Sequence, residues 1–70
     1  MYAMIFSANL IRLRKMRKLT QQDVSLFLGV KQSTYSDWEC EKTFPSTRFI
    51  PKISEIFQVT PNDLFGVAVS

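Results

Sequence analysis

The segment GVKQSTYSDWE, residues 29–39, combines short hydrogen-bonding side chains with two large aromatic rings. Tyr35 and Trp38 lie three positions apart, so in a helix they would face the same side, toward a core. The other polar side chains would then face outward with no evident partner inside the protein: Lys31, Gln32, Ser33, Ser36 and Asp37. Amide, hydroxyl and carboxylate groups donate and accept hydrogen bonds, which makes these residues candidates for contact with another molecule.

The sequence offers little for catalysis or metal binding. It contains no histidine, and Cys40 is the single cysteine. Histidine is the commonest general base, and a structural zinc site needs several cysteine or histidine ligands. We therefore expect no catalytic residues, no metal and no cofactor, and we interpret Cys40 as a small surface or boundary residue. Nothing indicates an oxidising compartment, so we expect a cytoplasmic protein.

The composition favours one globular domain spanning residues 1–70. Hydrophobic residues make up 46% of the 70 residues and aromatic residues 13%, which is enough for a packed core. The apolar start, MYAMIF, is shorter than the core of a signal peptide, and no stretch has the length of a transmembrane helix. We expect no membrane partner.

Five cations crowd into seven residues near the N-terminus, although the formal net charge of the chain is only +3. They are Arg12, Arg14, Lys15, Arg17 and Lys18. Such a cluster suits a solvated helix face, long-range attraction of DNA, or a helix on a membrane surface. We interpret it as a source of long-range attraction at most.

The spacing of apolar residues predicts five helices. The first stripe begins at Phe6 and also includes Arg17. Thr20 followed by Asp23 forms a short-carboxylate capping box ahead of the second helix, and Gly29 permits a tight turn after it. The predicted helices cover about residues 6–18, 21–28, 32–40, a segment from 46 onward with Pro51 in its first turn, and a short segment after Thr60 that ends near Phe65.

The segment LTQQDVSLFLGVKQSTYSDWE, residues 19–39, resembles the helix-turn-helix of the Cro and phage cI repressor type, an XRE-like family. The resemblance extends to FSANLIRLRK at 6–15 and to PSTRFIPKISEIFQVTPNDLF at 45–65. It implies an all-α, compact five-helix, lambda-repressor-like bundle with a helix-turn-helix core at 20–39 and a tail at 66–70. The family binds double-stranded DNA, and the resemblance implies that the third helix lies in the major groove.

The resemblance gives the outward polar residues a partner, because base edges carry hydrogen-bond donors and acceptors. We expect the base contacts to come from Gln32, Ser33, Ser36 and Asp37. Gln32 is the strongest candidate, since a glutamine amide can pair bidentately with adenine. The family positions also imply phosphate contacts from Gln21, Lys31, Lys42 and Arg48. Gln21 is further expected to brace Gln32.

Arg14 and Glu39 match a family ion pair between the first and third helices, which implies a structural role for both. The sequence departs from the family pattern elsewhere. Lys18 and Glu41 stand where relatives often carry glycine, so a left-handed backbone there would be strained. Lys31 replaces the usual serine or threonine cap of the third helix.

The resemblance implies a sequence-specific transcriptional regulator, and we expect a repressor that binds a palindromic operator as a weak homodimer through residues 64–69. No small-molecule ligand is indicated. The DNA-binding part of a longer regulator would show the same pattern. The alternative is a protein-interaction module, antitoxin-like or a phage regulatory partner, marked by an exposed apolar patch at Leu26, Phe27 and the tail. For Phe27 itself we expect packing against Tyr35, with exposure as the alternative.

Overall fold

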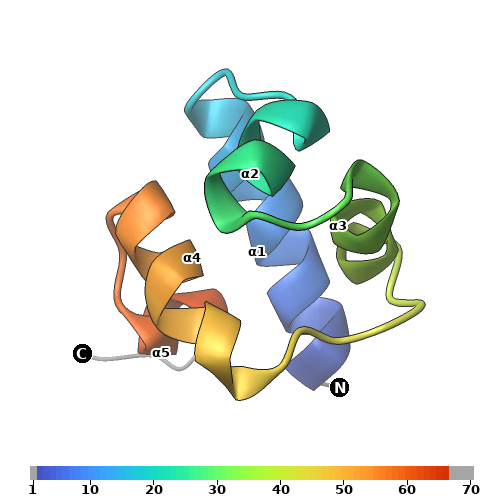
Figure 1. Ribbon diagram of the computed structural model, residues 1–70. Coiled ribbons are helices and arrows are strands. Elements are labelled where there is room, and N and C mark those ends of the chain that lie inside the picture. The colour runs from blue at the N-terminus through green and yellow to red at the C-terminus, as the bar shows by residue number, and fades with distance from the viewer. Residues whose placement is uncertain (1, 67–70) are drawn as a thin grey trace.

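Five helical segments, each burying one apolar face, make up the fold (Figure 1). The computed structural model describes the backbone of residues 2–66 and the side chains of residues 5–66. Over this range the chain forms five α-helices, one 3₁₀ turn and no β-strand, which confirms the predicted all-α class. In chain order the elements are α1 (Tyr2–Met16), α2 (Gln21–Leu28), α3 (Gln32–Glu39), η1 (Thr47–Phe49), α4 (Ile50–Phe57) and α5 (Pro61–Leu64).

Helix α1 begins and ends earlier than the apolar pattern predicts. The prediction was residues 6–18, whereas the helix spans Tyr2–Met16. No proline or glycine interrupts residues 2–5, so nothing in the sequence prevents the helix from starting there. At the other end Lys18 adopts a left-handed φ of 57°, and the Leu19 amide donates to the Arg14 carbonyl, which closes the helix.

Helices α2 and α5 begin with the same kind of capping box. The Thr20 hydroxyl accepts from the Asp23 amide and the Asp23 carboxylate accepts from the Thr20 amide, and Thr60 and Asp63 repeat this box. The hydrogen bonds from Thr20 hold the pKa of Asp23 below its ordinary value. Gly29 ends α2 with a φ of 72°, so the predicted cap and turn are confirmed.

Helix α4 starts later than expected. Pro51 lies in its first turn, as predicted, but Thr47–Phe49 form a 3₁₀ turn and the α-helix begins only at Ile50 rather than near Ser46. Short 3₁₀ turns are frequent at helix ends. The helix closes at Gln58, whose φ of 55° is left-handed without the glycine that usually signals such an ending.

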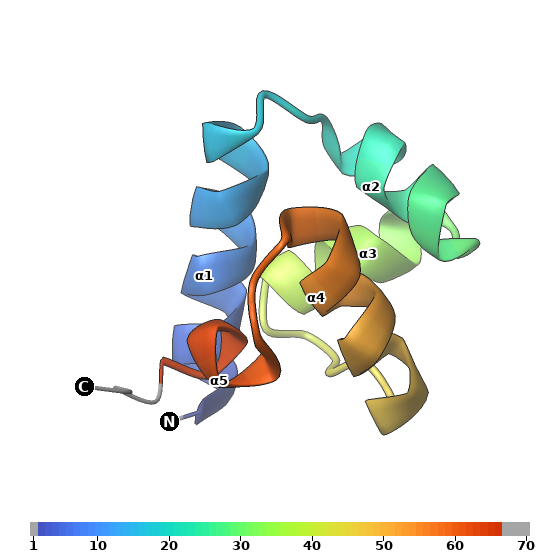
Figure 2. The ribbon, with the colours of Figure 1, turned by 90° about the vertical axis from the view of Figure 1, so that its left-hand side faces the viewer.

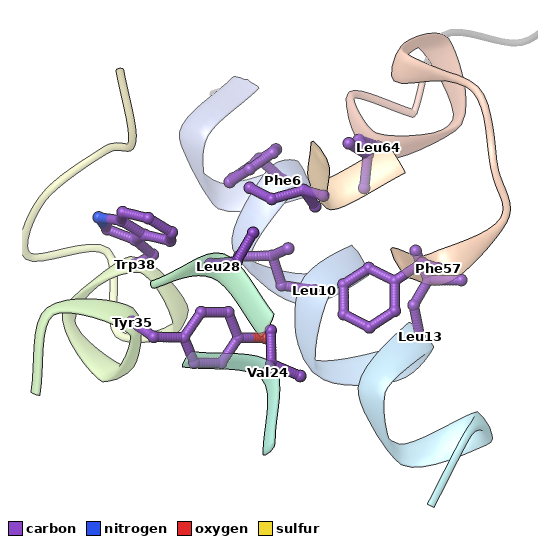
Figure 3. Close-up of a cluster of buried hydrophobic side chains, with 10 residues drawn as sticks. Phe6, Leu10, Leu13, Val24, Leu28, Tyr35, Trp38, Phe57 and Leu64 are labelled. Atoms are coloured by element: carbon purple, nitrogen blue, oxygen red, sulfur yellow. The ribbon is translucent and has the colours of Figure 1, made fainter. Parts of the chain in front are cut away.

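One continuous core joins all five helices (Figure 3). The buried apolar side chains are Phe6, Leu10, Leu13, Val24, Leu28, Tyr35, Trp38, Ile53, Phe57 and Leu64. The inward positions predicted for Tyr35 and Trp38 are confirmed. The expected role of Leu64 in a dimer surface is wrong, because α5 packs this leucine into the core; residues 67–69 of that predicted surface lie outside the described residues.

Helix α5 is held against the N-terminal half of α1 (Figure 2). Asn9 Nδ2 donates to the carbonyls of Leu64 at 2.9 Å and Asp63 at 3.1 Å, and so satisfies acceptors at the end of the short helix. Gly66 follows with a φ of 70°, directly against the side chain of Ile5. The two ends of the described chain therefore pack together.

Candidate nucleic-acid interface

Helices α2 and α3 are joined by a turn of three residues. The amide of Gly29 donates to the carbonyl of Ser25, which closes the last turn of α2. Helix α3 then begins at Gln32, with Lys31 at the N-cap and no side-chain hydrogen bond to the cap. The expected lack of side-chain capping at Lys31 is confirmed. The turn brings the start of α3 to the surface beside α2 (Figure 1).

Helix α3 is anchored by aromatic packing on one face. The rings of Tyr35 and Trp38 meet edge to face with centroids 5.9 Å apart, and Trp38 also packs on Phe49 at 5.5 Å. Such contacts fix the rotation of the helix about its own axis. The other face carries the predicted base-contacting residues: Gln32 and Ser33 are exposed, and Ser36 and Asp37 are half-buried.

The polar face of α3 is free of internal bonds. Within residues 5–66, the side chains of these four residues donate or accept no hydrogen bond from the rest of the protein. Their bonds are made by the main chain, as where the carbonyl of Asp37 accepts from the Lys42 amide at 2.9 Å. A side chain at the surface with unused donors and acceptors can exchange water for another polar partner.

Three helices meet at the carboxylate of Glu39. Arg14 on α1 donates from Nε to Oε2 at 2.7 Å and from its terminal nitrogen to Oε1 at 3.2 Å. Gln21 on α2 donates to Oε1 at 2.9 Å. Arg14 also donates to the Leu19 carbonyl at 2.9 Å, so the guanidinium closes α1 and binds α3 at once. The Arg14–Glu39 pair predicted from the resemblance is confirmed.

Burial and charge oppose each other at this carboxylate. Burial acts to raise the pKa of Glu39, but the hydrogen bonds from Arg14 and Gln21, the nearby hydroxyl of Tyr35 and the charge of Arg14 outweigh it, so the pKa lies below its ordinary value. The same contact raises the pKa of Arg14. Glu39 is therefore a carboxylate throughout the neutral range.

The sequence of the chain is similar to that of a known protein family. The sequence profile of the family described as "Helix-turn-helix domain" matches residues 8–68. The chain belongs to this family. No solved structure matches the chain.

A relative of this helix-turn-helix domain is the "Uncharacterized HTH-type transcriptional regulator YqaE" of Bacillus subtilis (strain 168). The two sequences are 36% identical over 56 residues, which is 80% of this chain and 48% of the relative. The chain thus spans about half the length of the curated relative that it matches.

The four phosphate-contact candidates lie in different settings. Lys31 and Lys42 are exposed on either side of α3, while Arg48 is exposed with its guanidinium 4.8 Å from the centre of the Phe49 ring. Gln21 is half-buried and donates to Glu39, not to Gln32, so the expected brace between the two glutamines is not formed. An ionised carboxylate is also a stronger acceptor than the amide of another glutamine.

The loop after α3 takes the strained course that its sequence suggested. Glu41 has a φ of 64°, and Lys18 before α2 has a φ of 57°, so both charged residues occupy the left-handed region that favours glycine. Each costs about 1 kcal/mol relative to a right-handed backbone. The alternative, a different path of this loop that would move Lys42 and Thr43, is therefore not taken, and the Lys42 amide reaches the Asp37 carbonyl of α3.

Two polar contacts of α1 were not found from the sequence. Arg17 donates to the carbonyl of Phe57, the last residue of α4, although the apolar stripe had suggested only an inward position. Ser7 is buried and donates to the Trp38 carbonyl at 2.7 Å. Neither residue belongs to a recognisable motif, and both contacts depend on where another helix ends.

The hydroxyl of Tyr35 is buried in the same region. Among the described residues it has no hydrogen-bond partner of normal geometry. The carboxylate of Glu39 and the guanidinium of Arg14 are nonetheless near enough to act on it. Burial, followed by the influence of Glu39, raises the pKa of Tyr35 far above its ordinary value, so the phenol stays neutral.

The expected packing of Phe27 against Tyr35 is wrong. Phe27 is 58% exposed and its neighbour Leu26 is 71% exposed, so together they form an apolar surface on α2. Phe27 lies one position away from the inward residue Leu28, and on a helix that step of about 100° turns the ring off the core. The exposure agrees with the alternative for Phe27.

In the described part of the chain, no helix combines the length and the apolar character needed to cross a membrane. Nor do three cysteine, aspartate or glutamate side chains gather there closely enough to hold a metal ion. Cys40 is exposed, as expected for a surface residue.

Proposed function

We propose that this helix-turn-helix domain binds double-stranded DNA sequence-specifically and regulates transcription, as a repressor. The observation that carries the proposal is the division of α3 into a buried aromatic face and a polar face without internal partners. The family to which the chain belongs and a relative described as a transcriptional regulator support the same reading. In this proposal α3 lies in the major groove, the only groove whose edges distinguish all four base pairs.

The polar residues divide between reading and positioning. Gln32 and Ser33, exposed in the first turn of α3, read base edges, and Ser36 and Asp37 extend the contact. Phosphate contacts come from Lys31, Lys42 and Arg48, together with the second N–H of Gln21, whose first is bound to Glu39. Phosphate contacts set affinity and register but carry no sequence information.

The domain is further proposed to bind a palindromic operator as a homodimer. One α3 presents only four candidate residues for reading bases. Twofold symmetry doubles the number of bases that the protein reads. Half-sites would then lie about 34 Å apart, one turn of DNA. Binding of two chains per operator, measured by mass photometry or sedimentation, is expected; one chain per operator would contradict the homodimer.

Selection of bound sites from a random duplex pool tests the central proposal. The domain should enrich one sequence motif, and titrations at matched salt should then compare that site with a scrambled duplex. Gln32→Ala should reduce discrimination between the two by about 1–3 kcal/mol, since it removes one bidentate contact. Gln22→Ala is the matched control, because Gln22 is an exposed glutamine on α2. Equal losses on both duplexes for Gln32→Ala would remove its reading role.

Arg48→Ala supplies the complementary result. Loss of a phosphate contact should weaken binding to both duplexes by a similar factor and reduce the salt dependence of binding by about one counterion. Lys52→Ala, an exposed cation on α4, is the control for general charge. If Arg48→Ala instead changed the preferred sequence, its assignment to the backbone would be wrong.

A second candidate function is a protein-interaction module on the same scaffold. The exposed pair Leu26 and Phe27 favours it, because such large apolar side chains on one helix are a common feature of contact surfaces. A salt-insensitive complex with a protein, lost in Phe27→Ser and kept in Gln32→Ala, would support this function. Enrichment of a DNA motif with full retention of binding in Phe27→Ser would support the regulator.

A further inference from the structure

Ser7 forms a bond that the other buried serines of the domain do not. Serine hydroxyls inside helices usually bond to a carbonyl of their own helix. Ser54 follows this rule with the Ile50 carbonyl at 3.0 Å, and Ser25 with the Gln22 carbonyl at 2.8 Å. Ser7 instead donates from α1 to the carbonyl of Trp38 on α3, across 31 positions of sequence.

The acceptor of this bond lies at the end of α3. The last four carbonyls of a helix have no partner within it, and a buried one must find a donor elsewhere. Amides of the following loop donate to the main-chain carbonyl of Asp37. Arg14 and Gln21 donate to the side-chain carboxylate of Glu39. Ser7 donates to the main-chain carbonyl of Trp38, which lies between these two residues. Donors from outside the helix therefore bind three successive residues of the last turn of α3.

Ser7 and Arg14 bind α3 from two different positions along α1. Seven residues separate them, which is close to two turns, so both lie on the side of α1 that faces α3, about 10.5 Å apart along the axis. One binds the main chain of α3 and the other a side chain of the next residue. Two attachments at different positions along α1 restrict the tilt of α3 against α1 more tightly than one attachment would.

The polar side chains at the start of α3 make no comparable bond to α1. Gln32 is six residues before Trp38, about 9 Å along the helix, and its side chain has no bond to residues 5–66. A tilt of about 10° at the attached end would move Gln32 by about 1.6 Å, more than the width of the range of normal hydrogen-bond lengths. Flexible lysine contacts to phosphates would tolerate the same movement.

We propose that Ser7 is a positioning residue that sets the angle of α3 and thereby the sequence discrimination of the domain. The inference rests on the proposed function, because it concerns how well Gln32 and Ser33 reach base edges. Ser7 itself touches no DNA; it acts through the Trp38 carbonyl. It therefore affects the ratio of specific to nonspecific affinity more than it affects either the fold or general DNA binding.

The test compares Ser7→Ala with Ser54→Ala. Both changes delete a buried serine hydroxyl bonded to a carbonyl, but Ser54 bonds within α4. The readout is the ratio of affinities for the selected site and a scrambled duplex at matched salt. Partial unfolding cannot move this ratio, since it lowers both affinities by the same factor. Ser7→Ala should lower the ratio by about three- to tenfold, and Ser54→Ala should keep it within about twofold.

Equal ratios for the two variants and the wild type would overturn the positioning role while leaving the proposed function intact. A wild-type domain that enriches no DNA motif would overturn both. If Ser7→Ala does not fold, Ser7→Cys replaces it, because a thiol leaves no cavity in place of the hydroxyl and is only a weak donor. In the folded variant without DNA, the amide NMR signals of Gln32 and Ser33 should shift; signals unchanged from wild type would also overturn the proposal.

Discussion

The carboxylate of Glu39 at the end of α3 accepts a hydrogen bond from Nε of Arg14 on α1 at 2.7 Å. The exposed fractions of the two side chains are 4% and 14%, so the pair is almost excluded from water. Gln21 joins the same carboxylate from α2. The helix that carries the candidate reading residues is therefore fixed to both helices that precede it, through one charged group.

Replacement of Glu39 by alanine should destabilise the domain strongly. The change would leave Arg14 with the Leu19 carbonyl as its main partner and Gln21 without an acceptor. Loss of one partner of a fully buried pair costs about 3–5 kcal/mol, and the partial exposure of Arg14 reduces the expected cost to about 2–3 kcal/mol. Urea unfolding would measure it. Glu55→Ala, an exposed carboxylate on α4, should change stability by less than about 0.5 kcal/mol. Similar values for both variants would contradict a structural role of the pair.

The same carboxylate should make stability depend on acid pH. The pKa of Glu39 is lower in the folded protein than its ordinary value of 4.5, so at acid pH the unfolded chain binds more protons. The stabilisation is complete above about pH 5 and is lost as the pH falls through the folded pKa. Asp23 contributes in the same direction. Unfolding free energies measured between pH 7 and pH 3 should therefore fall less steeply in Glu39→Gln than in the wild type, whereas Glu55→Gln should keep the wild-type slope.

Local chemistry made much of this fold predictable. The box formed by Thr20 and Asp23, the turn at Gly29 and the position of Pro51 each depend on neighbours in sequence, and each is found where expected. The inward positions of Tyr35 and Trp38 follow equally from spacing alone. The ion pair between Arg14 and Glu39 is different, because 25 positions separate the partners and only the family resemblance suggested it.

What could not be predicted depends on how helices meet. Ser7 looks like any serine on a helix, and its bond to the Trp38 carbonyl exists only because α3 ends beside α1. Arg17 reaches the Phe57 carbonyl for the same reason. Phe27 lies beside the apolar stripe of α2, where spacing alone allows either packing against Tyr35 or exposure, and in the structure it is exposed. The roles of Gln32, Ser33, Ser36 and Asp37 at DNA remain predictions, as do those of Lys31, Lys42 and Arg48.

Glycine at the two strained loop positions should stabilise the domain. Lys18 and Glu41 have φ values of 57° and 64°, in the region where a side chain costs about 1 kcal/mol and glycine almost nothing. The greater freedom of glycine in the unfolded chain offsets part of the gain, so Lys18→Gly and Glu41→Gly should each stabilise by about 0.5 kcal/mol. Lys52→Gly within α4 should instead destabilise by about 1 kcal/mol. Thermal unfolding would compare the three, and a loss of stability in both loop variants would mean that the side chains contribute more than the strain removes.

Gly66 should tolerate alanine less well than Gly29, although their backbones are nearly identical, with φ values of 70° and 72°. A Cβ at Gly29 would meet nothing within 4 Å, so Gly29→Ala carries only backbone strain, about 1–2 kcal/mol. A Cβ at Gly66 would lie 2.5 Å from Cγ2 of Ile5, and the clash should add about 1–3 kcal/mol by pushing α5 away from α1. Ile5→Ala removes the obstructing methyl group, so the double variant should recover at least about 1 kcal/mol relative to the sum of the single changes. Strictly additive costs in urea unfolding would show that α5 is held by Asn9 and Leu64 without help from the close approach at Gly66.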